Sequence, residues 1–68
     1  MQKYLLDNRE VIIEFSQIGS FVKVSAMDVA TLTEKSIQGP ASALQSTLEQ
    51  NALKRLRYVL EKKGIIRA

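Results

Sequence analysis

Apolar and polar residues alternate along residues 11–38 with the period of two that is typical of β-strands. Two such runs, VIIEFSQI and FVKVSAM, meet at Gly19-Ser20, and a third run, TEKSIQ, follows after a short break. A two-residue loop containing glycine between alternating runs is a strong signal of a β-hairpin. The pattern therefore predicts a three-stranded antiparallel β-meander.

A type II′ loop at Gly19-Ser20 fixes how the first two strands pair. It sets Ile18 opposite Phe21, which places Phe15 across from Val24 on the face that we predict to be the core side. The opposite face then carries the polar residues of both strands, among them Glu14, Ser16, Lys23 and Ser25.

The break between the second and third runs, residues 28–32, is predicted to be a turn in which Asp28 accepts a hydrogen bond from an amide two residues on. Placing Ile37 beside Val24 sends Glu34 and Ser36 to the solvent. A slip of one residue would bury these two polar side chains, so the first register is favoured.

The spacing of apolar residues changes to three and four after Pro40, as on one side of a helix. Ser42 and Gln45 fit a capping box at its start, although Ser46 and Glu49 fit the same motif one turn later. Gly64 suits the left-handed position just after a helix, and Ile65, the next residue, is then placed to fold back on Leu60. The sequence thus predicts an α+β domain of order β-β-β-α, with one C-terminal amphipathic helix packed on the apolar face of the meander.

The chain has 68 residues, enough for one small domain, which we assign to residues 10–68. Residues 1–9 are expected to be a flexible tail or an apolar strap that covers a neighbour. A single core of this size rarely supplies more than about 3–5 kcal/mol, and small domains often rely on disulfides, a metal or a second subunit. The sequence contains no cysteine and no histidine, so we expect no disulfide, no metal site and no cofactor.

The apolar side of the predicted helix fills an arc of roughly 180°, wider than the stripe of about 100° that one packed face needs. Its residues are Leu44, Leu48, Ala52, Leu53, Leu56, Val59 and Leu60. Either the N-terminal segment or a second copy of the chain must cover the remainder. We therefore predict a homodimer, with contacts at Leu53, Leu60, Ile65 and Ile66.

Basic residues gather in the last third of the chain. Residues 1–41 carry four cations and five acids, a net charge of −1, whereas residues 42–68 carry six cations and two acids, a net charge of +4. A basic helix of this kind suits non-specific binding to nucleic-acid phosphates, but we favour the simpler interpretation of a solvated helix face whose charges complement the helix ends. The residues available for phosphate contact are Lys54, Arg55, Arg57, Lys62 and Lys63.

The sequence offers little for catalysis. No histidine or cysteine is present to activate a serine, and Glu14 and Glu34 are predicted on a solvated face rather than in a pocket. We therefore expect no catalytic residues and no enzyme. No apolar run approaches the about 18 residues of a membrane helix, so we expect a cytoplasmic protein without membrane contact.

The stretch VIIEFSQIGSFVKVSAMDVATLTEKSIQGPASA, followed by ALKRLRYVLEKKG, resembles a family of small uncharacterised bacterial proteins, a domain of unknown function, from about Val11 to Ile66. The resemblance implies no catalytic or ligand-binding residue. Such sequences show Asp-Pro and Thr-Gly at the second turn, whereas Val29 and Leu32 stand at these positions in this chain, and positive φ at Leu32 would strain the turn. The sequence as a whole predicts a non-catalytic interaction module that self-associates, with nucleic-acid binding as the alternative.

Overall fold

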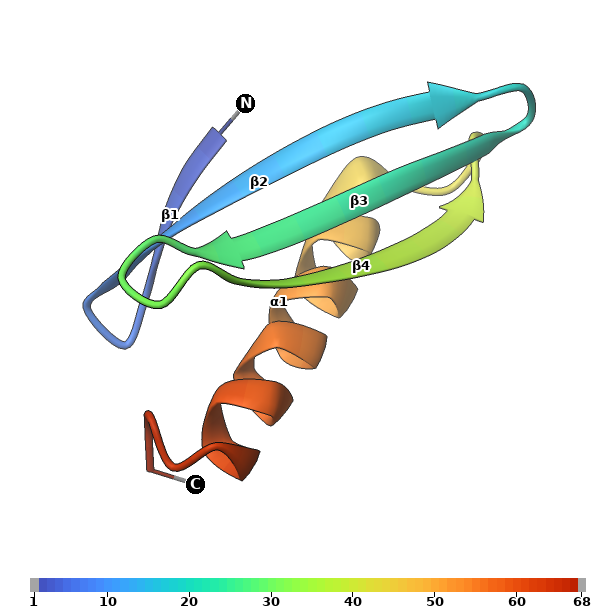
Figure 1. The fold of residues 1–68 in the computed structure, drawn as a ribbon. Helices are drawn as coiled ribbons and strands as arrows, with labels where there is room; N and C mark the ends of the chain where they lie inside the picture. Colours follow the sequence, from blue (N-terminus) through green and yellow to red (C-terminus); the bar gives the residue numbers. More distant parts are fainter. Residues whose placement is uncertain (1, 68) are drawn as a thin grey trace.

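The computed structural model describes residues 2–67, which form an antiparallel sheet followed by one helix (Figure 1). The predicted class, α+β with a C-terminal helix, is confirmed, but the prediction of three strands is wrong because the described residues form four. The strands lie side by side in the order of the sequence. The elements are β1 (Gln2–Leu6), β2 (Arg9–Ile18), β3 (Phe21–Asp28), β4 (Thr33–Pro40) and α1 (Gln45–Lys62).

The additional strand, β1, pairs with β2 through a two-residue loop. Leu6 lies opposite Arg9, and the loop residues Asp7 and Asn8 have φ angles of 52° and 65°. Positive φ at both central residues is what a type I′ hairpin requires, and aspartate and asparagine tolerate it better than other residues with a side chain. The segment expected to be a tail or strap is therefore a strand at the edge of the sheet.

Strand β1 is also bound to the helix. Leu6 is buried, and the Tyr4 hydroxyl donates a hydrogen bond to the Glu49 carboxylate of α1. Arg57 of α1 donates to the Asp7 carboxylate in the β1–β2 loop, with Nη1 2.6 Å from Oδ2. The N-terminal segment thus contacts α1 at Glu49 and at Arg57.

The hairpin between β2 and β3 has the predicted register. Ile18 pairs with Phe21 and Phe15 pairs with Val24 across a two-residue loop. Gly19 has a φ angle of 61°, the positive value that a type II′ loop requires at its first central residue.

The pairing of β4 is also as predicted, with Val24 opposite Ile37. The turn before β4 closes with a hydrogen bond of 2.7 Å from the Leu32 amide to the Asp28 carbonyl, and Leu32 has the positive φ expected of it, 59°. The Asp28 side chain, however, accepts from the amide of Thr31, three residues on, and not from the residue predicted.

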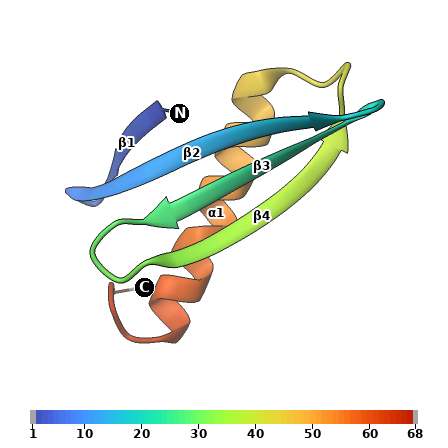
Figure 2. The same cartoon turned by 45° about the horizontal axis from the view of Figure 1, so that its top comes forward.

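Helix α1 lies diagonally across one face of the sheet, and the other face is open (Figure 2). Gly39 of β4 is buried under the helix, and a Cβ added there would lie 2.5 Å from Cδ2 of Leu48. The small residue therefore allows α1 to approach the sheet closely at this point. The core between the two layers consists of Leu6, Val11, Ile13, Val24, Ala26, Leu48, Ala52, Leu53, Leu56 and Leu60.

The two ends of α1 differ from each other in how they are capped. Leu44 occupies the N-cap position without a side-chain hydrogen bond, so neither predicted capping box is formed. The C-terminal prediction is confirmed: Gly64 has a φ angle of 76°, its amide bonds the Glu61 carbonyl at 3.0 Å, and the Ile65 amide bonds the Leu60 carbonyl at 2.9 Å. This pair of bonds is a Schellman motif.

Candidate functional site

Asp28 is the one fully buried charged side chain among residues 2–67. Its carboxylate accepts hydrogen bonds from Arg9 Nε at 3.0 Å and Nη2 at 2.9 Å, and from the Thr31 hydroxyl at 2.6 Å. The Arg9 guanidinium holds the pKa of Asp28 below its usual value against the opposing effect of burial, and Thr31 adds to this lowering. An ionised carboxylate with its donors fixed in this way holds the start of β2 to the β3–β4 turn. Its role is therefore structural rather than that of a proton donor.

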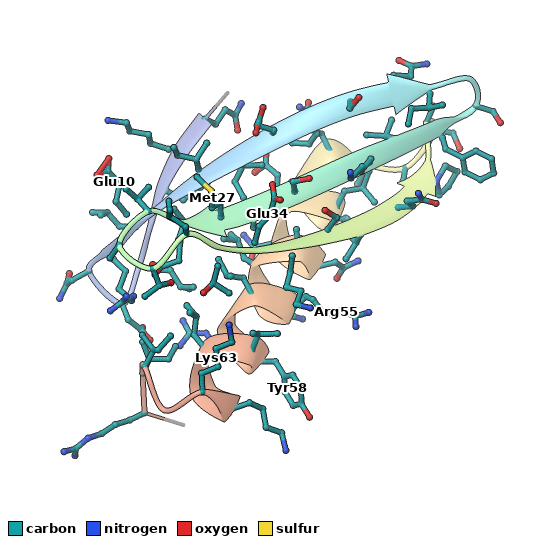
Figure 3. All side chains as sticks on the ribbon, in the orientation of Figure 1. Glu10, Met27, Glu34, Arg55, Tyr58 and Lys63 are labelled. Carbon is teal, nitrogen blue, oxygen red and sulfur yellow. The ribbon has the colours of Figure 1, made fainter. Side chains whose placement is uncertain are left out.

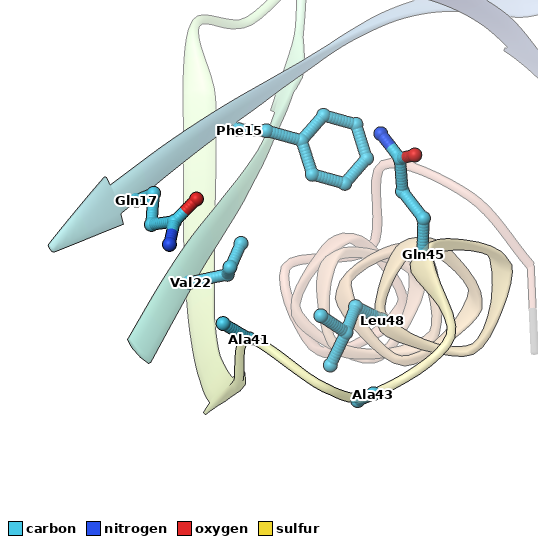
Figure 4. Close-up of a pocket in the computed structure, with 7 residues that line it drawn as sticks. All are labelled: Phe15, Gln17, Val22, Ala41, Ala43, Gln45 and Leu48. Atoms are coloured by element: carbon cyan, nitrogen blue, oxygen red, sulfur yellow. The ribbon is translucent and has the colours of Figure 1, made fainter. Parts of the chain in front are cut away.

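A cavity of about 300 Å³ opens between the last residues of β2, the first residues of β3 and the start of α1 (Figure 4). The Phe15 ring lies beside the Gln45 side chain, and Gln17 and Gln45 supply side-chain amides. None of its lining residues carries a titratable side chain, so the cavity offers shape and hydrogen bonds but no acid or base. The lining residues are Phe15, Gln17, Val22, Ala41, Ala43, Gln45 and Leu48.

The face of the sheet turned away from α1, the outer face, carries exposed apolar residues at one end. Ile18, Phe21 and Pro40 stand opposite one another on β2, β3 and β4. The side chains of Ile18 and Phe21 are 60% and 57% exposed, and Pro40 is exposed as well. Three adjacent strands thus present a continuous apolar row to the solvent, which we call the tip row.

A second apolar group lies at the other end of the outer face. Ile12 of β2 pairs with Met27 of β3, and both are half-buried. Leu5 of β1 lies one step farther along and is 76% exposed. Figure 3 shows Met27 and Glu34 projecting from the side of the sheet opposite the helix. The pair formed by Ile12 and Met27 is called the Met27 pair below.

Between these two apolar groups the outer face is polar, as predicted. Lys23 lies opposite Ser16, and Glu14 lies opposite Ser25 one row farther along. Ser25 and Ser36 share a hydrogen bond of 3.0 Å between their hydroxyl groups. Along β2 and β3, from the tip row to the Met27 pair, the order is apolar, positive, negative and apolar, and the row of the Met27 pair is flanked by the exposed side chains of Lys3 on β1 and Glu34 on β4.

The cations expected to bind nucleic acid are not all placed alike. Lys54, Arg55, Lys62 and Lys63 are exposed on α1 or just after it, and the Lys62 ammonium lies 5.5 Å from the centre of the Tyr58 ring. Arg55 and Tyr58 point away from the sheet (Figure 3). Arg57 is half-buried and paired with Asp7.

The residues predicted for self-association lie in or against the core of a single chain. Leu53 is 8% exposed and Leu60 is fully buried, while Ile65 and Ile66 are half-buried and pack against the same core. Leu44, which had widened the predicted apolar arc, lies before the first residue of the helix and is 72% exposed. Leu6 of β1 and the C-terminal Ile65 and Ile66 pack in or against the same core, so the alternative in which the chain itself covers the helix is the one observed. The dimer itself stays a prediction and needs another surface.

Within residues 2–67, no three His, Cys, Asp or Glu side chains come together in a way that suits a metal ion. The single helix of this region is not long and apolar enough to cross a membrane.

Comparison with known proteins finds one family. The model of the family described as "Domain of unknown function (DUF6898)" matches residues 8–63. Neither the curated proteins nor the solved structures contain a match to the chain. The resemblance to an uncharacterised domain family is thereby confirmed.

Proposed function

This chain belongs to the DUF6898 family of domains of unknown function, and we propose that it is a small non-catalytic interaction module that docks through the outer face of its sheet. The observation that carries the proposal is the tip row, in which Ile18, Phe21 and Pro40 lie exposed on three neighbouring strands. Single exposed apolar residues are normal on a soluble domain, but adjacent ones rimmed by polar residues are typical of interaction sites.

The chemistry of the face defines the partner that it fits. The two apolar ends require apolar groups opposite them, and Lys23 and Glu14 between them require charges of the opposite sign. Aromatic residues such as Phe21 are enriched in the buried cores of protein interfaces. The partner is therefore a protein surface of the same kind, flat, apolar at its ends and charged in its middle.

The non-catalytic part of the proposal is supported by composition and by the two polar features inside the fold. The sequence has no histidine and no cysteine. Asp28 is committed to Arg9 and Thr31, and the cavity beside Phe15 is lined without titratable groups. Neither feature offers an acid and a base side by side.

The proposal is tested by site-specific photo-cross-linking in cells that express the protein. A photo-reactive phenylalanine analogue replaces Phe21 in one variant and Tyr58 in a control variant, and both positions are 57% exposed. We expect a discrete cross-linked product from position 21 that is absent from position 58. A product from neither position, or an equal product from both, would contradict docking through the outer face.

A second candidate function is non-specific binding to nucleic acid through α1, favoured by the exposed cations Lys54, Arg55 and Lys62 beside Tyr58. Phosphate contacts of this kind weaken steeply with salt. A mobility-shift assay at low and moderate salt tests this function, and the absence of retardation at low salt would end it. Because Arg57 is already paired with Asp7, Arg55→Ala should weaken binding more than Arg57→Ala.

A further inference from the structure

The outer face is nearly complementary to itself along β2 and β3. Each end is apolar, and between the ends one row is positive and the next row is negative. Along β2 and β3 the rows are the tip row, the row of Lys23, the row of Glu14 and the Met27 pair. If a second face is laid on the first with its strands reversed, its Met27 pair meets the tip row. Its Glu14 row then meets the Lys23 row, and the same contacts form again at the other end.

We infer that the occupant of the outer face is a second copy of this chain, packed sheet on sheet with its strands antiparallel to those of the first. This inference rests on the proposed function and names its partner. A two-fold axis across the strands places Ile18 over Ile12 and Phe21 over Met27 of the other copy, and at the β4 edge it places Pro40 over Glu34. Since the axis exchanges the copies, each of these contacts occurs twice, as in the isologous interfaces of closed dimers.

The charges of the two central strands favour this orientation over its alternative, although the alternative would place Lys3 of one copy opposite Glu34 of the other. An axis along the strands would also bring apolar residues together, because Ile18 would meet Phe21 and Ile12 would meet Met27. However, it would set Lys23 beside Lys23 and Glu14 beside Glu14 of the two copies. Like charges facing each other at an interface oppose association, whereas the antiparallel arrangement sets Lys23 beside Glu14 twice.

The size of the face indicates a weak dimer. At about 3.4 Å per residue and about 4.8 Å per strand, the eight residues of β3 and the four strands span roughly 27 Å by 19 Å. Two such faces bury on the order of 1,000 Å² in total, near the lower limit for specific interfaces. The twist of the two sheets sets them at about 30° rather than flush, which still leaves the central rows of β2 and β3 in contact. The helices lie on the two outer sides of this dimer and keep their exposed cations in solvent.

Sedimentation equilibrium between about 1 μM and about 1 mM protein, the range suited to the dissociation constant of a small interface, tests the inference. We expect reversible dimers for the unaltered protein and association roughly 100-fold weaker for Phe21→Ser, which loses two buried rings per dimer. Leu44→Ser is the matched control, since Leu44 is even more exposed but lies outside the sheet, and it should leave association unchanged.

Charge reversal then tests the orientation. Lys23→Glu and Glu14→Lys should each dimerise about tenfold more weakly than the unaltered chain, because each sets two pairs of like charges face to face. Mixing the two variants should restore association, because Glu at position 23 of one chain then meets Lys at position 14 of the other. In the alternative orientation either single variant would merely exchange one like-charged pair for another and leave the affinity unchanged.

Three results would overturn the inference. The first is a monomer throughout the concentration range, and the second is a dimer that Phe21→Ser does not weaken. The third is a dimer indifferent to either charge reversal. A monomer that still yields a cross-linked product of another protein from position 21 would retain the proposed function and reject only the second copy as its partner.

Discussion

The ion pair of Asp28 and Arg9 gives the most specific prediction about stability. Asp28→Asn keeps the size of the side chain but replaces one carboxylate oxygen with an NH₂ group. Arg9 and Thr31 present only hydrogen-bond donors to the two carboxylate oxygens, at 2.6 to 3.2 Å. Whichever oxygen is replaced, the new NH₂ group must therefore face at least one of these donors. The variant therefore loses hydrogen bonds and leaves the Arg9 charge without its counter-ion.

The expected loss of folding free energy follows from the burial of the ion pair. Breaking a buried ion pair from one side costs about 3–5 kcal/mol. The Arg9 side chain is 23% exposed and can turn partly to water, so we take the lower end, about 3 kcal/mol. A domain of this size is stabilised by only about 3–5 kcal/mol. Asp28→Asn should therefore leave at most about 2 kcal/mol of stability at 25 °C.

Urea denaturation followed by circular dichroism, at one fixed protein concentration, measures this loss. At about 1 kcal/mol per M urea, the midpoint should fall by about 3 M. Glu14→Gln is the matched control, because Glu14 is exposed and its loss of charge should change stability by less than about 0.5 kcal/mol. An Asp28→Asn midpoint no lower than that of Glu14→Gln would refute the structural role assigned to the pair.

The same pair predicts how stability depends on acid. The pKa of Asp28 is lower in the folded chain than in the unfolded chain, chiefly through the hydrogen bond from Arg9. The unfolded state therefore takes up this proton at a higher pH than the folded state. The stabilisation is complete above the unfolded pKa of about 3.9 and is lost as pH falls through the lower, folded pKa. Asp28→Asn should lack this part of the acid dependence, whereas Glu14→Gln should retain it.

Two further substitutions test the backbone of the fold. Leu32→Gly should raise the melting temperature by about 2–4 °C relative to Leu32→Ala, because glycine alone adopts the positive φ of 59° without strain. Loss of the Leu32 side chain itself should matter little, because the residue is 70% exposed. Equal melting temperatures of the two variants would contradict this prediction. Gly39→Ala should cost about 1–3 kcal/mol in urea denaturation, because its Cβ would lie 2.5 Å from Leu48. The cost should shrink in a Leu48→Ala background, and an unchanged cost there would show that the clash is not its cause.

The meander was predictable because its signals are local. Alternation from residue 11 to residue 38 and a glycine at position 19 set the register of β2, β3 and β4, and each pairing is observed. Gly64 predicted the end of α1 in the same way, because glycine adopts a positive φ without the steric cost that other residues pay. Such features are encoded within a few neighbouring residues.

Strand β1 was missed because its turn has no glycine. Asp7 and Asn8 both adopt positive φ, and this less common pair gave a weaker signal than Asn-Gly or Asp-Gly. The five residues of β1 are held by contacts distant in sequence, such as that of Tyr4 with Glu49. This omission also left outside the predicted domain Leu6, a residue of the core, and the side chains of Tyr4 and Asp7 that bond α1.

The alternation of apolar and polar residues was sufficient to predict the tip row, but the tip row was not recognised from the sequence. The polar residues of the outer face, Glu14 and Lys23, were placed correctly, while Ile18 and Phe21 were considered only as partners across the turn. Both side chains are exposed because the alternation places them on the face turned away from α1, which no other element covers within residues 2–67. A count of the apolar residues on each face of the predicted sheet would have indicated it.

An NMR experiment on a mixed sample tests the proposed pairing of copies most directly. Chains labelled at the methionine methyl groups are mixed with unlabelled chains at about 1 mM, where a small interface is expected to be populated, and filtered NOEs between the two kinds of chain are recorded. Phe21 and Met27 are six residues apart on β3, about 20 Å, so no such NOE can arise within one chain. Antiparallel packing of the outer faces predicts a cross-peak between the Met27 methyl and the Phe21 ring. Its absence, with both signals assigned, would contradict the arrangement.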